Sequence, residues 1–284
     1  MATATESNPS SLPKQPSSEL SGSHDGPSTT PVLPPPPHLR PGLRHLSILP
    51  NVFTSLNLLC GYFSILLTSR EEYLMAGWMI VLAVIFDILD GRIARLTSVT
   101  SRFGAELDSL ADLVSFGVAP AFLVFTRYMS DSRILGLVAT SIFVICGALR
   151  LARFNVTPPS GKDVFTGLPI PAGAGILCTL TIFEMQFFNI LRVPDGIIPF
   201  VVVGTSFLMV SQIEYPAMKK SPKTSYQRRL LVLFSIVALI VAPPLTLFFY
   251  SWGYAFYGVF MFFFRKSMSL LRRKDHISAE ALLK

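Results

Sequence analysis

Long apolar runs dominate this chain, and they restrict it to helices that cross a membrane. Backbone inside a bilayer must satisfy its own hydrogen bonds, so about 20 consecutive apolar residues form a spanning helix. Run length and flanking charge predict eight such segments: 51–68, 73–95, 104–127, 134–154, 170–191, 196–213, 229–250 and 252–264. We therefore expect an all-α integral membrane protein with about eight transmembrane helices.

The composition supports this class. Of the 284 residues, 51% are hydrophobic and only 14% are charged. The mean hydropathy is +0.53, as is typical of a polytopic membrane protein. The three cysteines, Cys60, Cys146 and Cys178, lie inside apolar runs without the spacing of metal ligands. We expect them to be packing residues, and we expect neither a disulfide framework nor a zinc site.

Composition also divides the chain into three parts. Residues 1–40 are rich in Ser, Pro, Thr and Gly, and cannot bury enough apolar surface to offset the entropy of ordering. We interpret them as a disordered cytoplasmic tail, and their pattern is not that of a secretory signal peptide. Residues 41–265 form the predicted polytopic membrane domain, and 266–284 form a basic cytoplasmic tail.

The basic residues predict the orientation. With the amino terminus in the cytoplasm, all but four of the 24 lysines and arginines fall on the cytoplasmic side. The exceptions are Arg70, Arg127, Arg133 and Arg192. This distribution explains the net charge of +7 without nucleic-acid binding. Basic residues near the membrane surface attract anionic lipid by about 1 kcal/mol each.

The stretch 86–112, FDILDGRIARLTSVTSRFGAELDSLAD, places four aspartates and three arginines between apolar runs. An ionisable group at the centre of a membrane helix costs about 2.5–3.5 kcal/mol on insertion scales, so such residues usually serve function. Steps of three and four residues place one group on a single helical stripe: Asp87, Asp90, Gly91, Ala94 and Arg95. A second group repeats every four residues: Gly104, Asp108 and Asp112.

If the LTSVTSR segment between these groups turns the chain, two carboxylate stripes face each other at one membrane surface. Oxygen ligands of this kind suit Mg²⁺ and Mn²⁺, and Mg²⁺ is commonly shared between carboxylates and substrate phosphates. All four histidines lie outside the predicted spans. Chemistry at this stretch therefore has to depend on carboxylates and metal.

Together the eight residues read D-x2-D-G-x2-A-R-x8-G-x3-D-x3-D. This pattern resembles the signature of the CDP-alcohol phosphotransferase family at every position. The resemblance implies that family's fold, with catalysis in residues 41–265 and a homodimeric assembly. It also implies transfer of a substituted phosphate from a CDP-linked donor to an alcohol, release of CMP, and dependence on Mg²⁺ or Mn²⁺.

The resemblance implies a role for each aspartate. Asp87, Asp90, Asp108 and Asp112 would hold one or two metal ions on the diphosphate. Asp108 and Asp112 are the catalytic candidates, and Asp112 resembles the residue proposed as general base for the acceptor hydroxyl. Positioning of the acceptor is the alternative role for Asp112.

The nucleotide side of the motif depends on small residues and on one arginine. Gly91 and Ala94 would let the nucleotide come close to the helix backbone, although helix packing also favours small residues at this spacing. The planar guanidinium of Arg95 can make paired hydrogen bonds to the oxygens of a diphosphate. Asn51 and Thr54 belong to a PNxxTxxN element that resembles the family's nucleotide side, with helix capping as the alternative.

A second resemblance concerns the acceptor. RLARFN at 150–155 and GLPIPAG at 167–173, with NLLCGYFSI and GAELDSLADLVSFGVAPA, resemble the bacterial membrane-embedded phosphatidylserine synthases. The donor would then be CDP-diacylglycerol, the acceptor L-serine, and the location the bacterial inner membrane. Arg150, Arg153 and Asn155 could hold the serine carboxylate or a lipid phosphate, or the arginines could anchor the helix at the interface.

Two alternatives remain open from the sequence. The same chemistry could use glycerol phosphate, inositol or its phosphate, or choline as the acceptor. The carboxylates could instead form a divalent-cation site in a transporter, although that function does not require Gly91, Ala94 and Arg95. Glu184 lies in the fifth run without an evident partner, so a subunit contact or a water pocket are its candidate roles.

Overall fold

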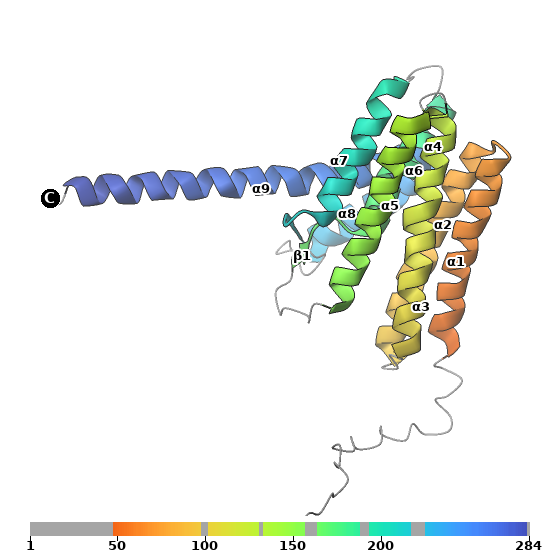
Figure 1. The fold of residues 1–284 in the computed structure, drawn as a ribbon. Coiled ribbons are helices and arrows are strands. Elements are labelled where there is room, and N and C mark those ends of the chain that lie inside the picture. Colours follow the sequence, from red (N-terminus) through yellow and green to blue (C-terminus); the bar gives the residue numbers. More distant parts are fainter. Residues whose placement is uncertain are drawn as a thin grey trace, which may run out of the picture. The chain divides into compact units, whose positions relative to one another are not determined.

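The computed structural model describes residues 48–97, 102–130, 133–156, 164–187, 193–216 and 225–282. The tail predicted for residues 1–40 lies outside these ranges. In chain order the elements are α1 (Ile48–Ser69), α2 (Tyr73–Thr97), α3 (Arg102–Asp112), the π-helical turn η2 (Leu113–Val118), α4 (Ala119–Tyr128), α5 (Arg133–Val156), β1 (Val164–Thr166), α6 (Ile170–Phe187), the 3₁₀ turn η3 (Asp195–Ile197), α7 (Ile198–Val210), β2 (Glu214–Pro216), α8 (Ser225–Val241) and α9 (Pro243–Leu282) (Figure 1).

Within the described residues, six helical segments are long and apolar enough to cross a membrane. They are Leu49–Ser69, Tyr73–Leu96, Arg102–Tyr128, Arg133–Val156, Ile170–Phe187 and Pro243–Arg265. Two further apolar helices, Ile198–Val210 and Val232–Val241, are shorter. Each of the eight predicted runs thus corresponds to an apolar helix, and the prediction of a helical integral membrane protein is confirmed.

The boundary between the last two helices differs from the prediction. The apolar runs predict this boundary near residue 251, whereas α8 ends at Val241 and α9 begins at Pro243. Pro243 and Pro244 lack the backbone N–H that a helix interior needs, but proline fits the first turn of a new helix. The chain then continues as one helix to Leu282, so the backbone of the predicted eighth span and of the basic tail is continuous.

The first three spans are close neighbours in space. α1 is followed by a three-residue connection in which Glu71 has a φ of 63°, and α2 packs back along α1. α1 also contacts α3, η2 and α4, which together make up the third span. Figure 1 shows α1, α2, the third span and α5 lying side by side. This arrangement brings the start of α1, the end of α2 and the start of α3 to the same end of the bundle.

A small two-stranded sheet pairs two segments that are far apart in the chain and were not predicted as strands. β1 and β2 are antiparallel, and Phe165 lies opposite Tyr215. Arg153 of α5 donates to the carbonyl of Thr166 (3.1 Å) and to that of Val210 (3.5 Å). The β1–β2 sheet is therefore connected to the ends of α5 and α7.

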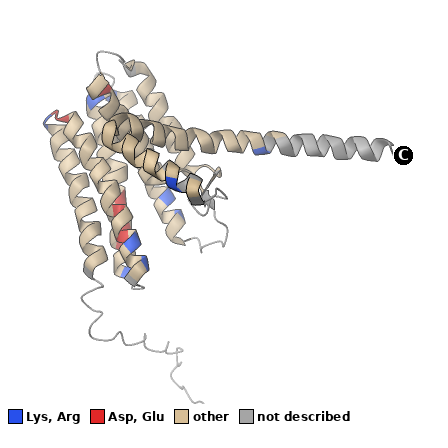
Figure 2. Ribbon diagram, turned by 180° about the vertical axis from the view of Figure 1, so that it is seen from behind, with Lys and Arg blue, Asp and Glu red and all other residues tan. Residues whose placement is uncertain are grey.

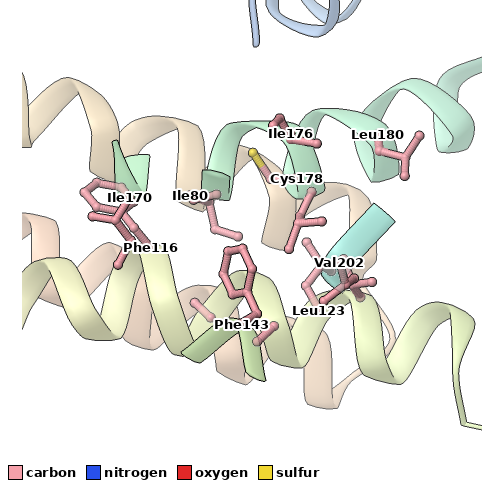
Figure 3. Packing of buried hydrophobic residues seen from close by; sticks show 14 of the residues in the cluster. Ile80, Phe116, Leu123, Phe143, Ile170, Ile176, Cys178, Leu180 and Val202 are labelled. Carbon is pink, nitrogen blue, oxygen red and sulfur yellow. The ribbon is translucent and has the colours of Figure 1, made fainter. Parts of the chain in front are cut away.

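The core lies where several helices meet. Figure 3 shows its side chains coming from α2, η2, α4, α5, α6 and α7, among them Ile80, Phe116, Phe143 and Val202. Cys178 is buried in this cluster, as predicted for a packing residue. Figure 2 shows long uncharged stretches along the helices, with acidic and basic positions gathered toward their ends.

Candidate active site

Three of the four predicted aspartates form one cluster. Asp87 and Asp90 lie on α2, and Asp108 lies on α3. One carboxylate oxygen from each lies within 4.8 Å of the others. Asp90 is buried, with 5% of its surface exposed, while Asp87 and Asp108 are half-buried. Helices α2 and α3 therefore bring the two carboxylate stripes together, as the sequence analysis expects.

This cluster has the donor set of a site for a hard divalent cation. Three carboxylates offer oxygen ligands, and Oδ1 of Asp108 is buried without a hydrogen-bond partner among the described residues. Mg²⁺ and Mn²⁺ prefer carboxylate oxygen, and they leave coordination positions for water and phosphate. The residues present therefore fit the metal that the family resemblance implies.

Asp112 lies one helical turn beyond Asp108 and has a different environment. Only 9% of it is exposed. Its Oδ1 accepts a hydrogen bond from Nδ2 of Asn57 on α1 at 3.2 Å. On the same helix, Oγ1 of Thr54 donates to Oδ2 of Asp90 at 3.1 Å. Helix α1 thus contributes one hydrogen-bond donor to the cluster and another to Asp112.

Asn57 was not among the candidate residues, although it ends the PNxxTxxN element. It lies one helical turn after Thr54, and that spacing was the available signal. Asn51, which was a candidate, is half-buried one turn before Thr54. Its carbonyl accepts a hydrogen bond from Oγ of Ser55 at 2.8 Å.

The residues predicted for the nucleotide side lie along α2. A Cβ atom added at Gly91 would meet no described atom within 4 Å, so packing against a neighbouring helix does not require glycine there. Ala94 is half-buried on the same helix. The exposed Arg95 donates from Nε to the carbonyl of Gly91 at 2.9 Å. Space beside Gly91 is therefore open, and the arginine borders it.

The three residues predicted for the acceptor side separate in space. Arg153 contacts the carbonyls of β1 and α7 described above. Asn155 donates from Nδ2 to Oγ of Ser109 on α3 at 2.9 Å. Arg150 is half-buried and interacts electrostatically with Asp112 and with Tyr254 of α9. Arg150 thus connects the end of α5 to an aspartate of the motif.

Tyr254 is a neighbour of the site that sequence reasoning missed. It lies on α9, and its ring packs at 5.3 Å between centroids against the ring of Tyr215 in β2. About 100 residues separate Tyr254 from Arg150, and no local pattern connects the two positions. Only the packing of α9 reveals this neighbour.

Comparison with known proteins places this geometry in a family. Residues 47–210 match the family model described as CDP-alcohol phosphatidyltransferase. The chain belongs to this family. The motif resemblance is therefore confirmed, and the matched region contains α1 to α7 in full. Helices α8 and α9 lie beyond the part of the chain that the family model covers.

Individual members of the CDP-alcohol phosphatidyltransferase family are similar over most of the chain. A CDP-diacylglycerol–serine O-phosphatidyltransferase of Helicobacter pylori is 36% identical over 220 residues, covering 77% of this chain and 92% of the relative. The CDP-diacylglycerol–serine O-phosphatidyltransferase of Methanocaldococcus jannaschii is 38% identical over 223 residues, covering 76% of this chain and 95% of the relative. An archaetidylserine synthase of Methanothermobacter thermautotrophicus is 42% identical over 171 residues, covering 59% of this chain and 69% of the relative. The predicted resemblance to phosphatidylserine synthases is confirmed.

Proposed function

We propose that this protein transfers the phosphatidyl group of CDP-diacylglycerol to the hydroxyl of L-serine, giving phosphatidylserine and CMP. The observation that carries the proposal is the cluster of Asp87, Asp90 and Asp108, with Asp112 beside it. It occurs in a chain whose relatives include enzymes named for serine as the acceptor.

Asp87, Asp90 and Asp108 would hold a divalent cation, Mg²⁺ or Mn²⁺, close to the diphosphate of the donor. A bound ion supplies positive charge that orients the diphosphate and stabilises CMP as the leaving group. The carboxylates fix where that charge lies relative to α2 and α3. Thr54 supports this role because its hydrogen bond orients Asp90.

Asp112 accepts the proton of the serine hydroxyl. The hydroxyl oxygen forms a bond to the phosphatidyl phosphorus, and the bond from that phosphorus to the oxygen of CMP breaks. The sequence analysis also placed Asp112 among the metal ligands. We assign it the proton because Asn57 already engages its Oδ1 atom.

The nucleotide lies along α2 beside Gly91 and Ala94, with Arg95 on the diphosphate. The open space at Gly91 supports this placement. Asn51 and Thr54 line the same side from α1, and a planar guanidinium can make paired hydrogen bonds to phosphate oxygens.

Arg150 binds the carboxylate of serine. Its guanidinium is half-buried close to Asp112, so a serine bound through its carboxylate presents its hydroxyl near the proposed base. Arg153 and Asn155 support the position of Arg150 by fixing the end of α5 to β1, α7 and α3.

The site opens to the cytoplasm of a bacterium, in its inner membrane, and the enzyme is a homodimer. Arginines at the aspartate end of the bundle support the orientation under the positive-inside rule: Arg92, Arg95, Arg102, Arg150 and Arg153. Light scattering of the detergent-solubilised protein tests the dimer, and labelling of a single cysteine introduced near residue 96 in intact cells tests the orientation.

The decisive experiment incubates membranes that contain the protein with CDP-diacylglycerol, Mn²⁺ or Mg²⁺ and labelled serine. We expect labelled phosphatidylserine and an equal amount of CMP. Parallel reactions contain glycerol phosphate, inositol, inositol phosphate or choline in place of serine. CMP release with one of these alcohols but not with serine would overturn the assigned acceptor and retain the chemistry.

A further inference from the structure

Asn57 is fully buried where α1 crosses the junction of α3 and η2, with an exposed fraction of 0%. Its Nδ2 atom donates to Oδ1 of Asp112, a residue 55 positions away in the sequence. A buried asparagine that bonds to a carboxylate restricts how that carboxylate can rotate. Asp112 is therefore held from a different helix.

The backbone of Asn57 is fixed from the same side. Oγ of Ser115, also fully buried, donates to the carbonyl of Asn57 at 2.9 Å. Ser115 belongs to the turn that follows Asp112 directly. Two hydrogen bonds thus connect Asn57 to the segment that carries Asp112, one through its side chain and one through its carbonyl.

Gly61 allows this close approach. A Cβ atom at Gly61 would lie 2.7 Å from Cα of Ser115 and 2.4 Å from its Oγ. Real Cβ atoms do not come that near to backbone, so a larger residue at Gly61 would push α1 away from η2. Asn57 lies one turn earlier on α1, and its reach to Asp112 depends on the same contact.

The helix that carries Asp112 changes its geometry at that residue. α3 ends at Asp112, and the π-helical turn η2 runs from Leu113 to Val118. Short π-helical turns are frequent at functional sites, because they redirect the side chains beside them. Asp112 itself keeps α-helical backbone angles, φ −60° and ψ −42°, and the irregular turn begins at the next residue.

We propose that Asn57 is the positioning residue for Asp112 in the transfer reaction, an inference that rests on the function proposed above. Asn57 holds Oδ1, so Oδ2 faces the acceptor hydroxyl. Thr54 has the corresponding contact with Asp90, which belongs to the cation cluster. The two donors of α1 therefore serve different steps: Thr54 serves metal and donor binding, and Asn57 serves proton removal.

The test is a set of α1 variants measured for kcat, for KM of both substrates and for half-maximal activation by Mn²⁺. Asn57→Leu should lower kcat by about 10- to 100-fold, since small misplacements of a catalytic group have effects of this order. KM for CDP-diacylglycerol and the Mn²⁺ requirement should stay within about twofold of wild type. Thr54→Val should instead raise the Mn²⁺ requirement. Ser55→Ala, an exposed change on the same helix, is the neutral control.

A double-mutant cycle separates positioning from a structural role. In an Asp112→Asn background, Asn57→Leu should cause no further loss of kcat, because the carboxylate that it orients is gone. If Asn57→Leu does not fold, Ser115→Ala removes a single hydroxyl and should still lower kcat alone by several-fold. An unchanged kcat in the folded variants, or additive losses in the cycle, would overturn the proposal. Absence of CMP release from wild type with every alcohol would instead overturn the proposed function.

Discussion

Arg127 of α4 and Glu184 of α6 form an ion pair with 3.6 Å between Nη2 and Oε1. The pair lies at the end of the third span, away from the aspartates at its start. The Arg127 guanidinium also lies over the rings of Tyr73 and Tyr128, at 5.7 and 5.2 Å from their centroids. Glu184, for which the sequence suggested no partner, therefore connects α6 to α4 and, through Arg127, to α2.

Glu184→Gln should lower the stability of the protein while leaving the site intact. Glu184 is 2% exposed, and breaking a fully buried ion pair costs about 3–5 kcal/mol. We expect a smaller loss, because 24% of the Arg127 side chain is exposed. Thermal unfolding in detergent should show a lower Tm, with kcat per folded molecule unchanged. An unaltered Tm would show that the pair contributes nothing to stability.

Asp108→Asn should remove metal-dependent CMP release. The change deletes one carboxylate of the cluster, and a lost metal ligand removes several kcal/mol of transition-state stabilisation, or more than about 100-fold in kcat. Glu106→Gln is the matched control, since Glu106 is an exposed acid on the same helix. Release of CMP at the wild-type rate by the Asp108 variant would exclude this residue from the mechanism.

Gly91→Ala should weaken substrate binding without loss of stability, whereas Gly61→Ala should lower the stability of the protein. A methyl group at Gly91 enters open space, so the variant should fold normally but bind CDP-diacylglycerol at least about 10-fold more weakly. A methyl group at Gly61 collides with the backbone of Ser115, and such overpacking costs about 1–3 kcal/mol of stability. Tm and KM measured on both variants check this. A stable Gly91 variant with normal KM would contradict the placement of the nucleotide.

Arg150→Lys should mainly raise KM for serine, whereas Arg153→Lys should mainly lower Tm. Lysine at position 150 keeps the charge but loses the planar fork, so KM for serine should rise about 10-fold with little change in KM for CDP-diacylglycerol. Arg153 bonds to the carbonyls of Thr166 and Val210, so its variant should mainly lower Tm. Steady-state kinetics with each substrate varied in turn would show the separation. Equal effects on KM for serine would mean that both arginines bind the acceptor.

The protein should lose stability at alkaline pH because of the buried hydroxyl of Tyr215. Burial raises the pKa of Tyr215 from 10.0 to about 12. Because the folded state holds the proton more tightly, this contribution is complete below pH 10 and is lost as the pH rises toward about 12. Tyr215→Phe should flatten that part of the profile of Tm against pH. It should not destabilise the protein at pH 7, because the Tyr215 hydroxyl is buried without a partner among the described residues.

The membrane class, the helical spans, the family and the two carboxylate stripes could be predicted from the sequence. These properties depend on local signals, namely run length, spacing along one helix and a motif within residues 87–112. The Pro243–Pro244 pair was also a local signal for the start of α9, although the sequence analysis placed that boundary several residues later.

The tertiary structure was needed to show which of those residues meet. It brings Asp87, Asp90 and Asp108 together, places Asn57 against Asp112, and brings Arg150 into electrostatic interaction with Asp112. Each of these contacts joins residues on different helices. Such contacts depend on how closely the helices approach, and at Gly61 that distance is set by a missing side chain facing Ser115.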